Sequence, residues 1–237
     1  MELEQLLRTY IPNLYAYRDR FLTSLQATGE MFLKAGLISF FIGLFFGIIL
    51  VTAKKDGIRE NLILYQIANT VINVFRSIPF LILLIFLIPF TRAVVGTAIG
   101  VKGAILPLVF GIVPFYTRQV EVALSSVDPG KVEAARSMGS GTLGIIFRVY
   151  LHEAVPELIR VTTVTAISLI GLTTMAGAVG AGGIGSFAIN YGQNQNHPDI
   201  VNVCVVVLLV IVFLLQSLGT LLARKSTNRS LFPRKHR

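Results

Sequence analysis

The chain contains few charged residues and a single cysteine, and each shortage excludes a class of protein. Charged residues make up 14% of its 237 residues, whereas a soluble globular domain usually carries about 25%. Hydrophobic residues make up 54%, and the mean hydropathy is +0.72. The composition therefore favours a membrane protein over a soluble one. Because Cys204 is the only cysteine, an internal disulfide is excluded.

The sequence also lacks the motifs of several enzyme classes. It contains no G-x-x-x-x-G-K-[ST] pattern, so this chain cannot bind ATP through a P-loop. The sequence shows no Ser/His/Asp or Cys/His grouping that would indicate a catalytic nucleophile. The three histidines lie far apart and lack the spacing of metal ligands: His152, His197 and His236. We therefore expect no catalytic residue and no metal site.

One glycine-rich stretch matches the pattern of a nucleotide-binding motif. Residues 180–185, GAGGIG, satisfy G-x-G-x-x-G, and Asp199 follows them. A dinucleotide site needs these glycines between a strand and a helix, whereas here they end an apolar run. Small residues let helices approach closely in a membrane, and irregular backbone is tolerated where it lines a cavity. The wider stretch, 173–185, therefore predicts helix packing or the lining of a pathway.

Long apolar runs predict an all-α integral membrane protein. A helix needs about 20 mostly apolar residues to cross the hydrocarbon core, and five runs meet this need: 35–53, 69–90, 96–117, 161–181 and 200–223. The uncharged stretch 61–75 could form a separate span. Its polar side chains favour a lead-in to the second span instead: Asn61, Gln66, Asn69 and Asn73. Four prolines are expected to interrupt helices at membrane depth: Pro79, Pro89, Pro107 and Pro114.

The basic residues predict which ends of the spans face the cytoplasm. Most of the 21 Lys and Arg fall in 54–59, 118–160 and 224–237, and five spans place these three segments on one face. The positive-inside rule makes that face cytoplasmic, with the N-terminus outside and the C-terminus inside. Six spans would put the N-terminus inside and fit the charges less well. The net charge of +9 is then explained by attraction of the basic residues to anionic lipid rather than by binding of nucleic acid.

This topology divides the chain into three parts. Residues 1–30 form an external amphipathic segment, 31–223 form the transmembrane domain with a cytoplasmic insertion at 118–160, and 224–237 form a basic cytoplasmic tail. Within the transmembrane domain, Arg76 either snorkels to the cytoplasmic boundary or contacts a substrate. Two glycine pairs have the G-x-x-x-G spacing of helix packing: Gly43/Gly47 and Gly96/Gly100.

The insertion predicts two short helices joined at glycine. Asp128 and Pro129 suit an N-cap and the first helical position, so a helix is expected at 129–137. Gly139 and Gly141 can take positive φ and end it. The second helix carries one apolar stripe: Leu143, Ile146, Phe147, Tyr150 and Leu151. The pair is either an amphipathic surface hairpin or a docking element for a cytoplasmic partner.

The insertion resembles the EAA motif of ABC-importer permeases, EAA-x3-G-x9-I-x-L-P. Four residues match its first part: Glu133, Ala134, Ala135 and Gly139. Val149 and Leu151 fall at the I and L positions, and His152 stands where proline is usual. In this family the motif forms the coupling helix, which sits in a groove of the ATPase subunit. The resemblance implies that this surface contacts an ATPase, through these residues: Glu133, Ala134, Ala135, Gly139, Leu143, Ile146, Phe147 and Leu151.

Residues 75–92 and 177–192 resemble the methionine-importer permeases, and the similarity runs from about 30 to 223. Polar-amino-acid permeases usually show R-G-T-P where this chain has Arg-Ser-Ile-Pro at 76–79. The resemblance implies a homodimeric pore in the bacterial cytoplasmic membrane, two ATPase subunits that bind ATP-Mg, an extracytoplasmic binding (lipo)protein, and alternating access. It places the pathway or gate at these residues: Arg76, Ser77, Pro79, Met175, Gly177, Gly180, Gly182 and Gly183.

Two alternatives stay open at this point. One is a permease for another amino acid or a short peptide, because the binding protein does much of the selection. The other is a secondary transporter that needs no ATPase. Such transporters usually carry acidic residues inside the membrane for ion coupling, and none lies in the five predicted spans.

Overall fold

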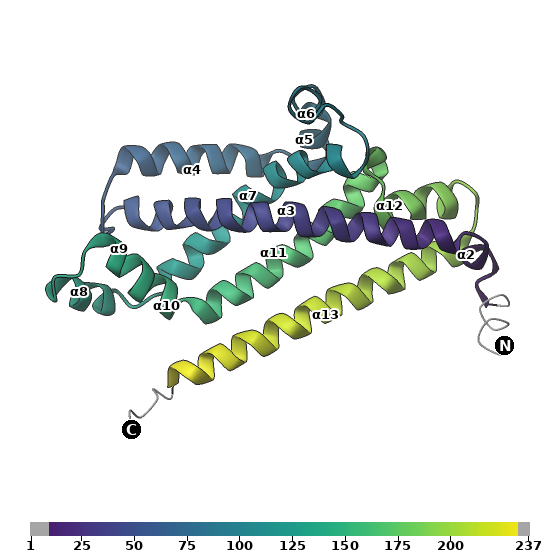
Figure 1. The fold of residues 1–237 in the computed structure, drawn as a ribbon. Helices are drawn as coiled ribbons and strands as arrows, with labels where there is room; N and C mark the ends of the chain where they lie inside the picture. Colours follow the sequence, from purple (N-terminus) through teal and green to yellow (C-terminus); the bar gives the residue numbers. More distant parts are fainter. Residues whose placement is uncertain (1–9, 232–237) are drawn as a thin grey trace. The chain divides into compact units, whose positions relative to one another are not determined.

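The computed structural model describes residues 10–231, and every element in that range is helical (Figure 1). The α-helices are α2 (Pro12–Ala16), α3 (Arg18–Ala53), α4 (Leu62–Ser77), α5 (Phe80–Phe86), α6 (Ile88–Val95), α7 (Gly100–Ser125), α8 (Pro129–Ser137), α9 (Thr142–Ile145), α10 (Leu151–Glu153), α11 (Val155–Ala176), α12 (Gly183–Phe187) and α13 (Pro198–Leu231). Three segments are π-helical: η1 (Ile146–Tyr150), η2 (Gly177–Ala181) and η3 (Ala188–Gln193).

Four of the described helices are long and apolar enough to cross a membrane: Arg18–Ala53, Gly100–Ser125, Val155–Ala181 and Pro198–Thr227. The bent pair α4 and α5 makes five if it counts as one span. The predicted all-α membrane fold of about five spans is therefore confirmed. The first nine residues of the predicted segment 1–30 lie outside the described residues, as does 232–237. Because α3 begins at Arg18 and continues to Ala53, a boundary at residue 30 stays a prediction.

The predicted second span, 69–90, is not one continuous helix. Helix α4 begins at Leu62, where the Asn61 side chain accepts a hydrogen bond from the Leu64 N–H at 3.0 Å. Asn61 is thus an N-cap, and the polar lead-in is itself helical. Helix α4 ends at Ser77 because Pro79 disfavours helical backbone in the preceding residue, and Ile78 is extended at φ −86°, ψ 122°.

Only two of the four prolines interrupt helices as predicted. Pro79 lies at the break before α5, and Pro89 lies in the first turn of α6. Pro107 and Pro114 lie inside α7, which is continuous from Gly100 to Ser125, so the prediction is wrong for them. Membrane helices tolerate proline where neighbouring groups satisfy the freed backbone carbonyls. Helix α7 also extends past the predicted end of the third span at 117.

The described residues form two compact units. Unit 1 comprises residues up to 38, 79–111 and 166–214, and unit 2 comprises 39–78, 112–165 and residues from 215 onward. The core of unit 1 centres on buried residues of α12 and α13: Ile184, Phe187, Ile200 and Cys204. The core of unit 2 joins α3, α7 and the insertion through these buried residues, among others: Val51, Tyr116, Val120, Leu124, Ala135, Ile145 and Tyr150.

The two G-x-x-x-G pairs differ in role. In unit 2, a Cβ added at Gly43 would lie 2.6 Å from Tyr116 Cδ1, and one at Gly47 would lie 2.4 Å from Val120 Cγ1. This pair therefore lets α3 and α7 pack closely, as predicted. Gly96 ends α6 at φ +84° and Gly100 has φ +74°, with no atom near an added Cβ at either position. The packing prediction is wrong for this second pair, which forms a turn instead.

Candidate functional site

Helix α8 begins and ends as the sequence predicts. Asp128 is the N-cap, and its Oδ1 accepts from the Gly130 N–H at 2.8 Å, with Pro129 at the first helical position. At the other end, the Ser140 N–H donates to the Ala135 carbonyl at 3.0 Å and the Gly139 N–H donates to the Arg136 carbonyl at 2.9 Å. These two bonds form a Schellman motif, in which the residue after the C-cap must adopt left-handed backbone. Gly139 supplies it, at φ +78°.

One face of α8 packs against the rest of unit 2, and the opposite face is exposed. Ala135 is buried in the core of the unit, and the Arg136 guanidinium donates to the Ile58 carbonyl at 3.3 Å. Lys131 Nζ lies 2.6 Å from Glu153 Oε2, so the start of α8 is joined to α10. Glu133 and Ala134 are exposed, and the Glu133 carboxylate lies 3.9 Å from Arg136. The two residues are therefore available to a partner.

The second helix of the insertion differs from its predicted form. Its middle part, η1, is π-helical, so side chains after Ile145 turn away from the positions that a 3.6-residue period gives. The predicted apolar stripe is divided: Leu143 and Phe147 are 70% and 64% exposed, whereas Ile146 and Tyr150 are buried. The contact of Leu143 and Phe147 with an ATPase stays a prediction, and Ile146 is buried against this chain instead. Ile145, which lies off that stripe, is 2% exposed and belongs to the core.

Tyr150 anchors the insertion from within the core. It is 8% exposed, and burial raises the pKa of its phenol, an effect that the positive charge of Arg136 partly opposes. The hydroxyl therefore stays neutral at physiological pH. Leu151 is partly buried against the same core. These two residues of the predicted stripe hold the insertion in place rather than face a partner.

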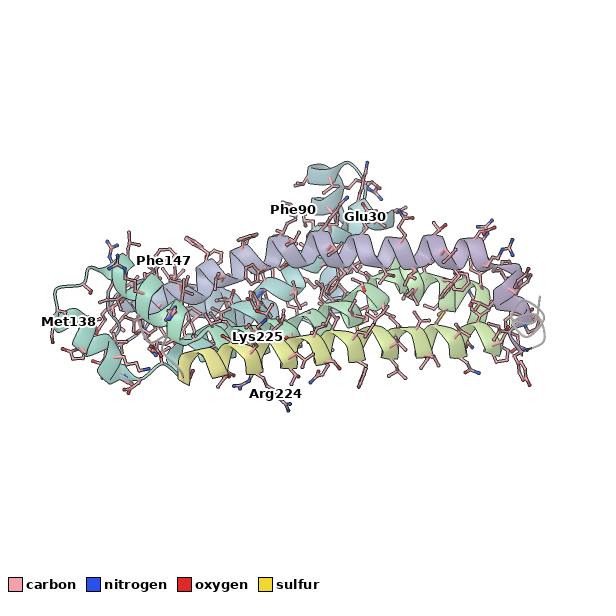
Figure 2. The ribbon with its side chains drawn as sticks, turned by 60° about the horizontal axis from the view of Figure 1, so that its bottom comes forward. Glu30, Phe90, Met138, Phe147, Arg224 and Lys225 are labelled. Carbon is pink, nitrogen blue, oxygen red and sulfur yellow. The ribbon has the colours of Figure 1, made fainter. Side chains whose placement is uncertain are left out.

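Three exposed apolar side chains, Met138, Leu143 and Phe147, form an apolar rim at an open hollow lined by the turn after α8, by α9 and by η1. The hollow has a volume of about 590 Å³ and is lined by Met138, Gly139, Ser140, Gly141, Leu143, Gly144, Phe147 and Arg148. Met138 is 78% exposed, more than Leu143 or Phe147. Figure 2 shows Met138 and Phe147 at the insertion. Exposed apolar side chains around a hollow are typical of an interaction site, and Met138 is a member of it that the sequence prediction missed.

His152 does not prevent the turn that proline usually makes at this position. Helix α10 continues through His152 to Glu153, and Ala154 leaves helical backbone at φ −82°, ψ 1°. Pro156 then follows in the first turn of α11, where a missing N–H costs no hydrogen bond. The helix is therefore interrupted at Ala154, two residues after His152, and Pro156 lies just beyond the interruption.

The predicted pathway residues fall in both compact units. Arg76 and Ser77 are exposed residues in the last turn of α4, in unit 2. Pro79 precedes α5, and Met175 is an exposed residue of α11, 53% accessible, both in unit 1. The structure therefore describes two sets of residues, and a pathway built from both stays a prediction.

The glycine run of unit 1 forms a packed chain reversal. Gly180, Gly182 and Gly183 have φ of +91°, +83° and +80°. A Cβ added at Gly183 would lie 2.6 Å from Thr28 Oγ1, and one at Gly177 would lie 2.6 Å from the Ser186 nitrogen. The run follows a helix rather than a strand, so it lacks the context of a dinucleotide site. Packing is the role that the structure shows here.

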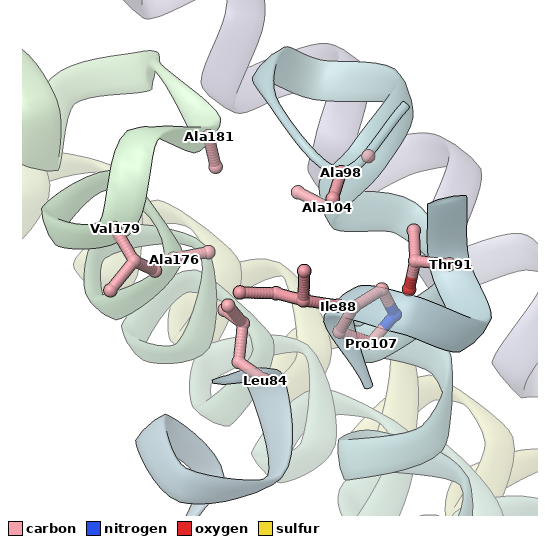
Figure 3. Close-up of a pocket in the computed structure, with 10 residues that line it drawn as sticks. Leu84, Ile88, Thr91, Ala98, Ala104, Pro107, Ala176, Val179 and Ala181 are labelled. Atoms are coloured by element: carbon pink, nitrogen blue, oxygen red, sulfur yellow. The ribbon is translucent and has the colours of Figure 1, made fainter. Parts of the chain in front are cut away.

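A small cavity of about 10 Å³ adjoins this reversal (Figure 3). Figure 3 shows Ala176, Val179 and Ala181 on one side, facing Leu84, Ile88 and Thr91 from α5 and α6 and Ala104 and Pro107 from α7. The lining is mostly aliphatic. Among the described residues, the buried Thr91 Oγ1 has no hydrogen-bond partner. A cavity of this size holds about one water molecule, so it is too small for a substrate.

A polar network on α4 and α7 was missed by the sequence analysis. Arg118 lies on α7, where it pairs with Glu121 and donates to Asn69 and Asn73 of α4. Tyr65 of α4 donates to Glu121 at 3.4 Å. The sequence signal for this network was the four-residue spacing of Tyr65, Asn69 and Asn73, which puts all three on one face of α4. Arg118 was assigned to a loop because the third span was ended at residue 117.

These features define a class of protein: a multi-span membrane protein with a helical insertion outside its spans. Residues 39–228 match the family model of the binding-protein-dependent transport system inner membrane component. The chain belongs to this family, which comprises the permease subunits of ABC importers, and it is a multi-pass inner-membrane protein.

Named relatives and solved structures agree with this assignment. The chain is 44% identical over 211 residues to the probable D-methionine transport system permease protein MetI of Vibrio cholerae, covering 89% of this chain and 94% of that one. It is 47% identical over 174 residues to the methionine import system permease protein MetP of Bacillus subtilis, covering 73% and 78%. It is also similar to a chain of the inward-facing MetNI methionine ABC transporter, with a TM-score of 0.87, 39% identity, and coverage of 89% and 98%.

Proposed function

We propose that the chain imports methionine as the permease subunit of an ATP-driven transporter. The observation that carries this proposal is 44% identity, over 89% of the chain, to a permease named for D-methionine transport. The described elements support it, since the insertion presents exposed residues of the EAA motif beside an apolar rim. In this proposal two copies form the pore, two ATPase subunits bind ATP-Mg, and an extracytoplasmic binding protein delivers methionine. The permease itself catalyses no reaction.

The proposed mechanism is alternating access driven through the insertion. ATP binding closes the two ATPase subunits, and the docked insertions move with them. Residues 133–151 transmit this movement because Ala135 and Arg136 of α8 hold that helix against the rest of unit 2. The pore opens outward and receives methionine from the binding protein, and hydrolysis resets the cycle. We assign the pathway or gate to 175–184 and to the end of α4 at Arg76 and Ser77.

A permease for another amino acid is the second candidate. An amino acid ABC transporter has the same fold, with a TM-score of 0.75 at 19% identity. The secondary-transporter alternative loses its basis with the family assignment. The spans do carry one acidic residue, contrary to the prediction, because α7 extends to Ser125 and includes Glu121, which is 8% exposed. That carboxylate is paired with Arg118 of the same helix.

Reconstituted transport tests the proposal. Vesicles that contain the chain, its ATPase and its binding protein should accumulate labelled methionine only with ATP, and unlabelled methionine should compete more strongly than other amino acids. The chain alone should hydrolyse no ATP, because it lacks a P-loop. Preferential competition by a different amino acid would reassign the substrate. ATP hydrolysis by the purified chain, free of other ATPases, would contradict the assignment of nucleotide chemistry to a partner.

Cysteine labelling tests the proposed orientation. The native Cys204 is 2% exposed, so it should contribute little background. Asn194→Cys should react with an impermeant reagent from the extracytoplasmic side, because it lies between η3 and α13. Ser137→Cys, at the exposed end of α8, should react from the cytoplasmic side and serves as the opposite control. Labelling of position 194 from the cytoplasm alone would contradict five spans with the N-terminus outside.

A further inference from the structure

Five side chains form one hydrogen-bonded network between α4 and α7 in unit 2. Tyr65, Asn69 and Asn73 lie four residues apart on α4 and face Arg118 and Glu121 of α7. The Arg118 guanidinium donates to Asn69 Oδ1 and, at 3.1 Å, to Asn73 Oδ1. Asn73 Nδ2 donates to Asn69 Oδ1 at 3.4 Å, and the Tyr65 hydroxyl donates to Glu121 Oε1 at 3.4 Å. The network thus spans two turns of α4.

The two charges at its centre do not by themselves join the helices. Arg118 and Glu121 form an ion pair within α7, and their side chains are only 22% and 10% exposed. Burying each charge is tolerated because the other neutralises it and hydrogen bonds satisfy the remaining atoms. The contacts between the helices come from Tyr65, Asn69 and Asn73. These three residues therefore fix the position of α4 along α7.

The start of α4 is connected to the insertion. Arg136 of α8 donates to the Ile58 carbonyl at 3.3 Å, and the Ile58 side chain packs against the core that contains Ala135. Three residues later, Asn61 caps α4. The Asn61 N–H also donates to the Ala53 carbonyl at 3.0 Å. A short, hydrogen-bonded connection therefore joins α8 to the first turn of α4.

We propose that the network couples movement of the insertion to the far end of α4, so that Asn69 and Asn73 are positioning residues for transport. This inference rests on the proposed ATP-driven import. Helix α4 is continuous from Leu62 to Ser77, and it ends at Arg76 and Ser77. With the network intact, α4 and α7 move as one body when the insertion moves. Without it, ATP hydrolysis continues while the end of α4 follows the insertion incompletely.

The ratio of uptake to ATP hydrolysis in the complete reconstituted transporter tests this inference. Asn69→Leu/Asn73→Leu removes both α4 acceptors of Arg118 and leaves the Arg118–Glu121 pair intact. We expect methionine uptake per ATP hydrolysed to fall by about fivefold, within the range that residues between coupled sites produce. Gln66→Leu/Thr70→Leu is the matched control, because it makes the same apolar change at two exposed residues of the same helix. That control should keep the wild-type ratio.

A conservative variant separates coupling from stability. Asn69→Gln keeps an amide oxygen acceptor for Arg118 without adding a charge and should keep a ratio close to wild type. A wild-type ratio in Asn69→Leu/Asn73→Leu would overturn the inference. If that double variant does not assemble, the same ratio is measured in Asn73→Leu, which changes only the exposed end of the network, and an unchanged value overturns the inference equally. Failure of the wild-type complex to import methionine would instead contradict the proposed function.

Discussion

Gly139→Val is expected to reduce association of the permease with its ATPase by about tenfold or more and to lower methionine uptake in parallel. Gly139 occupies the left-handed position of the Schellman motif that ends α8, at φ +78°. A β-branched residue is strained there, and such strain costs about 1–3 kcal/mol, of which each 1.4 kcal/mol corresponds to about a tenfold change in an equilibrium. No atom lies within 4 Å of an added Cβ, so within this chain the penalty comes from the backbone alone.

Co-purification of the ATPase with tagged permease, uptake and permease abundance should be measured together. Gly139→Asn is the matched control, since asparagine also adopts left-handed backbone at this position of a helix end and no atom lies within 4 Å of an added Cβ. It should retain both association and uptake. Glu133→Ala should be milder than Gly139→Val, because it removes one exposed side chain and keeps the helix. Normal association and uptake in Gly139→Val would make the insertion an ordinary surface hairpin.

Phe147→Ala is expected to weaken ATPase association by more than about tenfold while permease abundance stays normal. Phe147 is 64% exposed at the rim of the hollow beside Met138 and Leu143. If the rim is the docking surface, Phe147 is its aromatic anchor, and truncating such an anchor typically costs about 2 kcal/mol or more of binding energy. The folded permease loses little, because the side chain contributes little to its core. Binding of purified ATPase to detergent-solubilised permease measures this effect.

Ile145→Ala is the contrasting variant on the same segment. Ile145 is 2% exposed and belongs to the core of unit 2, so truncation should destabilise the permease by about 2–5 kcal/mol and lower its abundance. The permease that remains should show nearly normal affinity for the ATPase. Equal losses of abundance in the two variants would assign Phe147 to the core of the assembled protein and contradict its role as an anchor.

Local signals in the sequence predicted the ends of α8 correctly. The Asp128–Pro129 pair suits an N-cap and Gly139 suits a left-handed C′ residue, and both preferences act within a few residues of the chain. The structure shows both. The helical period was a poorer guide to the second helix, because the π-helical segment η1 changes that period and exposes Phe147 while it buries Ile146 and Tyr150. A single-turn change of this kind leaves no clear mark in the order of apolar residues.

The polar network is a feature that the sequence could not predict. Asn69 and Asn73 were noticed as polar residues in an apolar stretch, and Arg118 was noticed as a basic residue. Nothing along the chain indicates that they meet, because a contact between residues 69 and 118 depends on how two helices pack. The boundary of the third span concealed it further, since the hydropathy of Arg118 and Glu121 suggested a loop. The pairing of Arg118 with Glu121 lowers the cost of burying both charges in the helix, which continues to Ser125.

The sequence by itself determined the membrane class, the approximate number of spans, the helix–glycine–helix insertion and the family, because these depend on composition, on the length of apolar runs and on short-range backbone preferences. Tertiary structure alone decided which face of the insertion is exposed, that an ion pair of α7 is hydrogen-bonded to α4, and that the Gly43/Gly47 pair is used for packing within the chain. These features depend on distances between residues far apart in the sequence. Side-chain burial and charge neutralisation are settled only when such residues are brought together.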